Sequence, residues 1–589
     1  MGLLQQCSYT LSTNYGSIAT DLVRELPDRR AFAKVCKSLR RASAFRGPIG
    51  SPLPRSRRRY SPPVATSSPV SIAVDAGTTG IRALVVDEQA RVVDIAYREL
   101  TQHFPRPGWV EHDADEIWRL VRETLAEVTG RLADTGRRAR SIGITNQRET
   151  VVAWDRTTGR PLHRALVWQD RRTAERCARL EEEGHLPLVR EQTGLVLDPY
   201  FSASKMQWLL EEGGIPTGGG LTLGTVDSWI LWNLTGAAEG GVLATDVTNA
   251  SRTMLFDIVV RRWSAELCDL FHVPRSALAE VRPSCGRFGR VAPGVLGDGN
   301  GGDGSLAGVP ISAMVGDQHA ALFGQACFDR GMAKTTFGTG SFTLMHAGAT
   351  CPEPVDGLIT TIAWDLGPDG DVAIGADGGP RAGRSSLAYA VEGSIFVAGA
   401  GVQWLRDGLG IISESSELEP LARTVASSEG VVLVPAFSGL GSPHWDPGAR
   451  GTITGLSRGI GRAHLARAMI EAMGFQVRDV LDAMAATGTV PSVVRVDGGA
   501  AVMGLLLQHV ADQSRLEVVR PHSVETTALG AATMAGLAEG VWGSLDDLDA
   551  LWTEDASFRP EMDPAVADLA HASWTRSVER SRGWVDGPD

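Results

Sequence analysis

One short stretch decides the fold: VDAGTTGIR at residues 74–82. It follows the apolar run SIAV (71–74) and precedes a second run, ALVV (83–86), and each run fits a buried strand. A Gly and Thr cluster between two such runs predicts a tight hairpin with exposed amides and hydroxyls. Those groups suit phosphate oxygens, with Asp75 facing a hydrated Mg²⁺ and Arg82 as a charged donor. An ordinary Gly-rich turn is the alternative, and this stretch alone does not exclude it.

The composition is that of a soluble globular protein with room for more than one domain. The chain has 589 residues, of which 43% are hydrophobic and 21% charged. No apolar run approaches the roughly 18 residues needed to span a membrane. Its 7 cysteines form no CxxC pair, so neither a disulfide framework nor a zinc site is indicated. We expect a cytoplasmic protein in a reducing compartment.

Charge is distributed unevenly along the chain. Residues 1–70 hold 12 Lys and Arg against 3 Asp and Glu, whereas the whole chain has a net charge of −12. The remainder is therefore strongly acidic, which argues against nucleic acid as a partner. Lysine occurs only at Lys34, Lys37, Lys205 and Lys334 while arginine is abundant, and we interpret this bias as codon usage rich in G and C.

Residues 1–70 differ from everything that follows. They are rich in arginine and proline and show no helical or strand period. A disordered basic tail, a transit peptide and translated upstream sequence all fit this composition, although the acidic residues weigh against a transit peptide. We expect a disordered extension that need not be native. A first domain is then expected at 71–325, a second at 326–575 and a tail at 576–589.

Strands and helices alternate through the body. A capping box at Asp113 and Glu116 opens an amphipathic helix, which leads to the strand SIGI (141–144). This alternation predicts an α/β sheet with its site at the strand ends. The second half repeats the design with FGTGS (337–341), a long helix near 465–480 and the strand VVRV (493–496), which ends in a glycine turn. Two Gly-rich inserts, 297–304 and 367–383, are expected to be mobile surface loops.

Six motifs carry a family resemblance. They are GWVEHD (108–113), ITNQRET (144–150), WQDRR (168–172), TNASRTMLF (248–256), GDQHAALFG (316–324) and FGTGSF (337–342). From about residue 71 to 575 the chain resembles the FGGY carbohydrate kinase family. Within that family it resembles the glycerol kinases, because sugar kinases of the same fold do not normally carry the NQRE segment.

The resemblance implies both a fold and a reaction. The implied fold is α/β and of the two-domain actin, hexokinase and Hsp70 type, each lobe a ribonuclease-H-like mixed sheet flanked by helices. The implied reaction is ATP-dependent phosphorylation of glycerol to sn-glycerol 3-phosphate, with Mg²⁺. A homodimer or homotetramer is usual for relatives.

Asp317 is the candidate general base. It follows the apolar strand end at residues 314–316, where partial burial would raise its pKa, although an Asp after Gly also suits a turn cap. By resemblance, it takes the proton of the attacking hydroxyl. Arg148 and Glu149 pair a donor with an acceptor, which suits two neighbouring hydroxyls. The remaining residues that the resemblance assigns to glycerol are Trp168, Tyr200, Gln318 and Phe342.

The resemblance also assigns the nucleotide site. The matching positions are Thr78, Thr79, Gly80 and Arg82 in the first lobe, Thr339, Gly399, Gln403, Gly499 and Met503 in the second, and Asp75 for the metal. Three residues at or beside this site depart from the family: Gly80 replaces a usual serine, Ala76 a usual glutamine, and Met503 a usual asparagine. No Walker motif occurs, which excludes the P-loop route to the same chemistry.

Two other functions stay open from the sequence. One is kinase action on a longer polyol or a ketose; the other is a catalytically inactive member that senses nucleotide. The acidic insert 297–304 and Gly308, at a position where bacterial relatives carry an arginine, predict weak or no inhibition by fructose 1,6-bisphosphate. The absence of histidine between Gly286 and Ile311 predicts no activation by phosphohistidine.

Overall fold

The computed structural model describes residues 68–133, 135–296, 306–367 and 384–585. The expected N-terminal extension and nearly all of the two Gly-rich inserts therefore lie outside the described residues. Within these ranges no helix is both long and apolar enough to cross a membrane.

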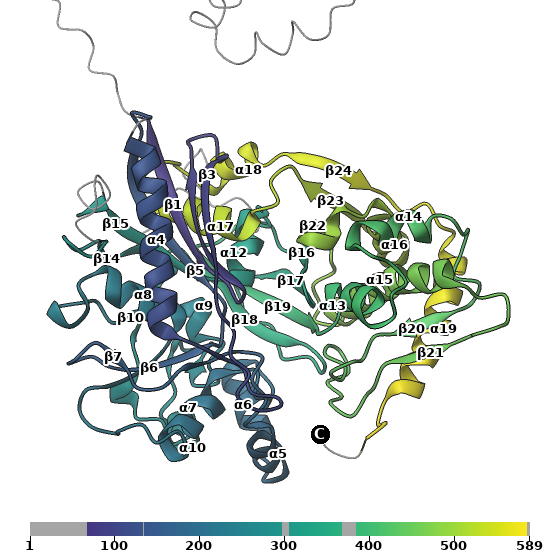
Figure 1. Ribbon diagram of the computed structural model, residues 1–589, viewed down its shortest axis with the longest axis horizontal. Helices are drawn as coiled ribbons and strands as arrows, with labels where there is room; N and C mark the ends of the chain where they lie inside the picture. Colours follow the sequence, from purple (N-terminus) through teal and green to yellow (C-terminus); the bar gives the residue numbers. More distant parts are fainter. Residues whose placement is uncertain (1–67, 134, 297–305, 368–383, 586–589) are drawn as a thin grey trace, which may run out of the picture. The chain divides into compact units, whose positions relative to one another are not determined.

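The first large sheet is built around the predicted hairpin. Its strand order is β14-β15-β5-β1-β2-β3, with β1 antiparallel to β2 and parallel to β5. The six strands are β1 (Pro69–Ala76), β2 (Gly80–Val86), β3 (Val92–Glu99), β5 (Arg138–Asn146), β14 (Cys285–Arg290) and β15 (Pro310–Gly316). Figure 1 shows α4 running along this sheet. The hairpin prediction is confirmed.

The second large sheet repeats the pattern of the first. Its order is β18-β19-β17-β16-β22-β23-β24, so an antiparallel set (β19-β17-β16) is followed by two parallel strands (β22, β23) and an antiparallel edge. In the first sheet β3-β2-β1, β5, β15 and β14 take these places. The seven strands are β16 (Met332–Phe337), β17 (Ser341–Gly348), β18 (Ile359–Asp365), β19 (Leu387–Ile395), β22 (Val493–Asp497), β23 (Glu517–Pro521) and β24 (Glu554–Phe558).

Smaller elements complete the body. A five-stranded sheet contains β4 (Glu111–His112), β6 (Val151–Asp155), β7 (Arg160–Pro161), β8 (Ala165–Leu166) and β9 (Leu221–Thr225). Three two-stranded ribbons contain β10 (Ala244–Asp246) with β13 (Glu280–Arg282), β11 (Phe256–Asp257) with β12 (Arg262–Trp263), and β20 (Val432–Val434) with β21 (Thr452–Thr454).

The helices differ widely in length. The first half has α4 (Ala114–Ala133), α5 (Ala174–Glu182), α6 (Leu186–Thr193), α7 (Ser202–Glu211), α8 (Val226–Leu234), α9 (Val247–Ala250), α10 (Ala265–Leu270) and α12 (Asp317–Gly324). The second has α13 (Gly399–Gln403), α14 (Leu418–Ala422), α15 (Arg462–Ala485), α16 (Gly504–Ser514), α17 (Thr526–Ala538), α18 (Leu545–Leu551) and α19 (Pro564–Ser581). Short turns are η1 (Ala237–Glu239), η2 (Arg275–Ala277), the π-helical η3 (Trp404–Gly408), η4 (Ser415–Glu417) and η5 (Gly499–Val502). Helix α19 continues past residue 575, where the tail was expected, because Trp574 and Val578 are buried.

The alternation of β1 explains how the first sheet is covered. Ile72 and Val74 pack with α4 and α8 on one face. Ala73, on the opposite face, belongs to a core that contains α12, α17 and residues of the second sheet such as Leu344. Helix α17, although it follows β23 of the second half, therefore packs against the first sheet. In Figure 1, α12 and α17 lie between the two sheets.

Two glycines let α12 and α17 touch backbone to backbone. A Cβ at Gly530 would collide with the carbonyl oxygen of Ala320, and a Cβ at Gly324 with that of Thr526. The contact is reciprocal, because each helix places a glycine against the backbone of the other. The close approach of the two sheets depends on the absence of these side chains.

We expect Gly530→Ala to destabilise the protein by about 1–3 kcal/mol, because the added methyl group overpacks the contact between the helices. The measurement is the midpoint of urea or thermal unfolding. The matched control is Gly130→Ala in α4, where a new Cβ would meet nothing within 4 Å. That variant should be neutral or gain up to about 1 kcal/mol from helix propensity. Equal effects of the two substitutions would contradict the packing account.

Candidate active site

The candidate site lies at the carboxyl ends of two neighbouring strands of the first sheet. Arg148 and Glu149 follow β5, and Asp317 begins α12 directly after β15. The strands are parallel with Gly316 opposite Asn146, so both chain segments leave the sheet side by side. The hydroxyl of Thr248 accepts a 2.8 Å hydrogen bond from the Gly316 amide, which fixes the approach to Asp317.

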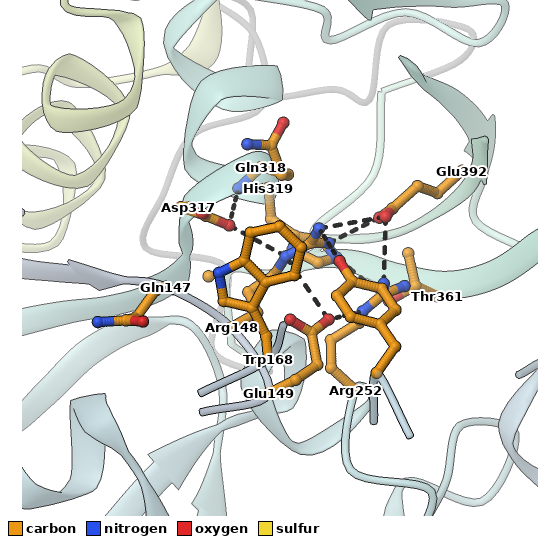
Figure 2. Close-up of polar contacts among 12 residues, drawn as sticks. Gln147, Arg148, Glu149, Trp168, Arg252, Asp317, Gln318, His319, Thr361 and Glu392 are labelled. Carbon is orange, nitrogen blue, oxygen red and sulfur yellow. Dashed lines mark hydrogen bonds and ion pairs between the residues drawn. The ribbon is translucent and has the colours of Figure 1, made fainter. Parts of the chain in front are cut away.

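A network of buried ion pairs occupies this position (Figure 2). Arg148 makes a double contact with Glu392 of β19 in the second sheet, at 2.6 Å from Nη1 and 3.1 Å from Nη2. Arg252 lies 2.6 Å from Glu149 and 3.1 Å from Glu392. All four side chains are at most 2% exposed. Charges this deeply buried are tolerated only when they are paired, so the four side chains hold one another in place.

The two glutamates of the network differ in acidity. Burial alone would raise the pKa of Glu392, but Arg148 and Arg252 outweigh it and hold that pKa well below its usual range. Burial raises the pKa of Glu149, and the same two arginines offset the rise only in part. Glu392 is therefore the fixed negative charge of the network.

Glu149 also sits in a strained backbone conformation. Its φ is +61°, and the amide of Thr150 donates a 2.7 Å hydrogen bond to the carbonyl oxygen of Arg148. This arrangement is a tight three-residue turn with a non-glycine residue at its centre. Such strain persists only where the surroundings enforce it, and it concentrates at functional sites.

Asp317 combines fixed contacts with partial access. Its Oδ1 lies 3.0 Å from Arg148 Nε and accepts a 2.7 Å hydrogen bond from the Gln318 amide, while the side chain remains 29% exposed. Burial raises the pKa of Asp317, and the charge of Arg148 opposes that rise. A partly exposed carboxylate with a raised pKa is suited to accept a proton.

Aromatic side chains stand beside these groups. The ring centroid of Trp168 lies 5.6 Å from that of Tyr200 and 6.1 Å from that of Phe342, both edge to face. The hydroxyl of Tyr200 accepts a 3.3 Å hydrogen bond from Arg148 Nη2. Trp168 Nε1 donates a 2.9 Å hydrogen bond to the hydroxyl of Thr78. This bond joins the aromatic wall directly to the β1–β2 hairpin.

Two glycine hairpins occupy equivalent places in the two sheets. The β1–β2 turn closes with a 3.0 Å hydrogen bond from the Gly77 amide to the Gly80 carbonyl, and the β16–β17 turn with a 2.9 Å bond between Gly338 and Gly340. In the second hairpin the Thr339 carbonyl accepts hydrogen bonds from Ala398 and Ala400. These contacts bring Thr339 next to Gly399 at the start of α13.

The second glycine turn closes on the same hairpin. At Gly498 φ is +87°, and a Cβ there would collide with the backbone of Phe337. Thr339, Gln403 and Gly499 are exposed residues. They leave an accessible, glycine-lined surface of the kind that lets a nucleotide approach the backbone.

Asp75 fits a cation. It is 8% exposed, and its pKa is raised to about 7 by burial, with Asp317 and Glu525 adding to the rise and Arg82 opposing it. Nearby carboxylates that resist ionisation together favour a bound positive ion. Among the described residues no three His, Cys, Asp or Glu side chains form a metal cluster. Mg²⁺ needs no such cluster, because one or two carboxylates, waters and phosphates suffice.

Comparison with known proteins shows the family. The models for the N-terminal and C-terminal domains of the FGGY family of carbohydrate kinases match residues 70–324 and 333–539. The chain belongs to the FGGY family of carbohydrate kinases.

Relatives and solved structures agree with this assignment. The chain is 46% identical to a glycerol kinase of Bordetella parapertussis (88% of this chain, 98% of that protein) and 48% identical to one of Polaromonas naphthalenivorans (87% and 99%). A crystal structure of Plasmodium falciparum glycerol kinase with ADP is similar at a TM-score of 0.79 and 34% identity (87% and 98%). A xylulose kinase from Rhodospirillum rubrum is similar at a TM-score of 0.72 and 25% identity (86% and 98%). The predicted family and the predicted actin-like fold of two α/β lobes are confirmed.

In this FGGY kinase most of the predicted polyol residues converge. Arg148, Glu149, Tyr200 and Asp317 contact one another through the network, and Trp168 and Phe342 stand beside it. Gln318 adjoins Asp317, but its Oε1 accepts a hydrogen bond from the buried Lys334. Their role in binding a substrate stays a prediction.

Two predicted nucleotide residues have protein partners. Arg82 donates a 2.6 Å hydrogen bond to Glu525, just before α17. Met503 is 7% exposed and belongs to the core of the second half, so its side chain faces the interior. Nucleotide contact by these two side chains stays a prediction.

The remaining predicted phosphate residues stand at the first hairpin. Thr78 bonds to Trp168, and Thr79 is exposed at the tip of the turn. At Gly80 a Cβ would collide with the ring of Tyr97 and with the backbone carbonyl oxygen of Arg98, so the usual serine could fit here only if the backbone as well as that ring moved. The carbonyl oxygen of Gly308 accepts a 2.7 Å hydrogen bond from Arg290. The guanidinium of Arg290 therefore lies next to Gly308, the position at which bacterial relatives carry an arginine. Bisphosphate insensitivity stays a prediction, since the acidic insert lies outside the described residues.

Sequence reasoning missed Glu392, Lys334 and Glu525. Glu392 had a usable signal, because it is the only charged residue in the buried strand LAYAVEGSI of β19. Arg252 lies inside the motif TNASRTMLF (248–256), which by itself does not indicate its role in the network.

We expect Glu392→Gln to lower the free energy of unfolding by about 3–5 kcal/mol, because two buried guanidiniums lose their shared carboxylate. The control is Glu517→Gln, whose partner Arg559 is 77% exposed. That surface pair should contribute no more than about 1 kcal/mol. The measurement is urea unfolding of both variants beside the parent protein, and similar midpoints for the two would contradict the assigned role of Glu392.

Proposed function

We propose that the chain transfers the terminal phosphoryl group of ATP to glycerol and forms sn-glycerol 3-phosphate. The observation that carries the proposal is the convergence of Arg148, Glu149 and Asp317 beside the aromatic wall. A small polyol needs hydrogen-bond partners for neighbouring hydroxyls, an apolar surface for its carbons and one base. The names of the relatives, glycerol kinases at 46–48% identity over most of the chain, support the same substrate.

Arg148 and Glu149 bind two hydroxyls of glycerol in this proposal. Arg148 donates three hydrogen bonds, two to Glu392 and one to Tyr200, and its Nε lies 3.0 Å from Asp317. The 3.0 Å contact between Arg148 Nε and Asp317 is the one that a substrate hydroxyl can replace. Trp168 and Phe342 cover the carbon atoms, and Tyr200 and Gln318 complete the pocket.

Asp317 accepts the proton of the attacking hydroxyl. The oxygen forms a bond to the γ-phosphorus, the bond between that phosphorus and the β,γ-bridging oxygen breaks, and ADP leaves. The first hairpin (Thr78, Thr79, Gly80) holds the phosphates, and Thr339, Gly399, Gln403 and Gly499 hold the nucleotide. Mg²⁺, when bound near Asp75, neutralises charge on the phosphates.

The cellular setting is part of the proposal. The cysteines in the described residues are free thiols, of which Cys177, Cys268, Cys285 and Cys327 are buried. Free thiols fit a reducing cytoplasm. A homodimer or homotetramer stays an expectation from the family.

The test is a coupled assay of ADP release with Mg-ATP and a panel of glycerol, longer polyols and ketoses. We expect glycerol to be the preferred acceptor, and Asp317→Asn to lower kcat by about 10²–10⁴-fold while the protein stays folded. If a ketose were the preferred acceptor, the assignment of glycerol as the substrate would be wrong. No turnover of any acceptor would favour the nucleotide sensor.

The pH profile tests the base separately. Because burial raises the pKa of Asp317, kcat/KM should fall on the acid side at a higher pH than the value of about 3.9 for an ordinary Asp would give. Above that limb the carboxylate is ionised and activity is constant. The residual activity of Asp317→Asn should lack this limb, and an acid limb shared by the variant and the parent would assign it to another group.

A further inference from the structure

Both lysines that the structure describes are fully buried beside the candidate site. Of 57 basic residues only four are lysines, and Lys34 and Lys37 lie outside the described residues. The other two, Lys205 and Lys334, both have 0% exposure. Lysine is almost never fully buried unless its charge is satisfied. Codon usage accounts for the abundance of arginine, but not for lysine at two buried positions beside the candidate site.

Lys205 fixes the segment that carries Tyr200. From α7 its Nζ donates hydrogen bonds to the carbonyl oxygens of Pro199 (2.7 Å), Tyr200 (2.7 Å) and Phe201 (2.8 Å). All three ammonium protons are thereby used on three consecutive residues. The next contact outward is the hydrogen bond from Arg148 to the Tyr200 hydroxyl.

Lys334 fixes the residue next to the candidate base. From β16 in the second sheet its Nζ donates to Gln318 Oε1 and, at 2.9 Å, to the hydroxyl of Thr336. Gln318 in turn donates its backbone amide to Asp317. With its oxygen engaged by Lys334, the side-chain amide of Gln318 is held in one orientation. The contact reaches from the second sheet to the start of α12, which follows the first.

Arginine cannot make either set of contacts. Its N–H groups lie in one plane and diverge in a fork, whereas the three carbonyls around Lys205 converge on a point. At Lys334 the larger guanidinium would have to fit a fully buried space. A compact ammonium on a flexible stem satisfies both positions.

We propose that Lys205 and Lys334 are positioning residues of the phosphotransfer site, Lys205 acting through Tyr200 and Lys334 through Gln318. The inference rests on the proposed function for the identity of the acceptor and for the place of Tyr200 and Gln318 in the acceptor pocket. Both lysines act on the acceptor side, because Tyr200 and Gln318 belong to the candidate polyol pocket and not to the nucleotide surface.

The experiment compares Lys205→Arg and Lys334→Arg with the full-length parent, using Mg-ATP and whichever acceptor the parent phosphorylates fastest. We expect kcat/KM for the acceptor to fall about 10–100-fold, the equivalent of losing hydrogen bonds to a charged group. The KM for ATP should stay within about threefold of the parent value. Arg559→Lys, at a 77% exposed position, is the control and should behave as the parent does.

Methionine variants keep the test decisive if the arginine variants do not fold. Lys205→Met and Lys334→Met remove the buried charge at nearly constant volume, and the same acceptor-side loss is expected. Acceptor kcat/KM within about twofold of the parent, or a parallel rise of the KM for ATP, would overturn the proposal.

A double-mutant cycle separates positioning from a general structural effect. In a Gln318→Leu background, Lys334→Met should add less than about a twofold further loss, because its route of action is already removed. A full, independent loss in that background would overturn the role of Lys334. If the parent phosphorylates another acceptor and not glycerol, the proposed function fails while the lysine test proceeds with that acceptor. If the parent protein phosphorylates none of the acceptors tested, both the proposed function and the positioning role of the lysines are overturned.

Discussion

The structure depends on one carboxylate shared by two buried guanidiniums. Glu392, from β19 of the second sheet, pairs with Arg148 and Arg252, which both belong to the first half of the chain. Removed from water, both arginines need carboxylate partners, and Glu392 is the one that they share across the two sheets. The same ion pairs therefore join the two sheets and set the geometry of the candidate pocket. Glu149 and Asp317 are oriented by the arginines that Glu392 holds.

The duplicated design explains why the site forms where it does. Each sheet carries a glycine hairpin, β1–β2 in the first and β16–β17 in the second. In each sheet the parallel strand beside that hairpin, β5 or β22, ends in a polar turn. Between the sheets, α12 and α17 touch at Gly324 and Gly530. This contact brings the two hairpins and strand ends into one region. The hydrogen bond from Trp168 to Thr78 then links the aromatic wall to the β1–β2 hairpin, the two surfaces that we propose for the polyol and the phosphates.

Local patterns predicted much of this arrangement. The hairpin at residues 74–82 follows from strand patterns, and a site at the strand ends follows from the alternation of strands and helices. The family resemblance supplied the lobes. Glu392 and Lys334 could not be placed, because their partners are 244 and 16 residues away and depend on how the sheets meet. For Met503 the resemblance to a nucleotide-contacting position was not enough, since sequence similarity does not reveal that this side chain enters the core.

The most direct test of the account is a crystal structure with glycerol, Mg²⁺ and a non-hydrolysable ATP analogue. We expect a primary hydroxyl of glycerol within about 2.6–3.2 Å of an Asp317 carboxylate oxygen, with Arg148 still bound to Glu392. Glycerol bound away from Asp317, or Arg148 detached from Glu392 with substrate in place, would contradict it.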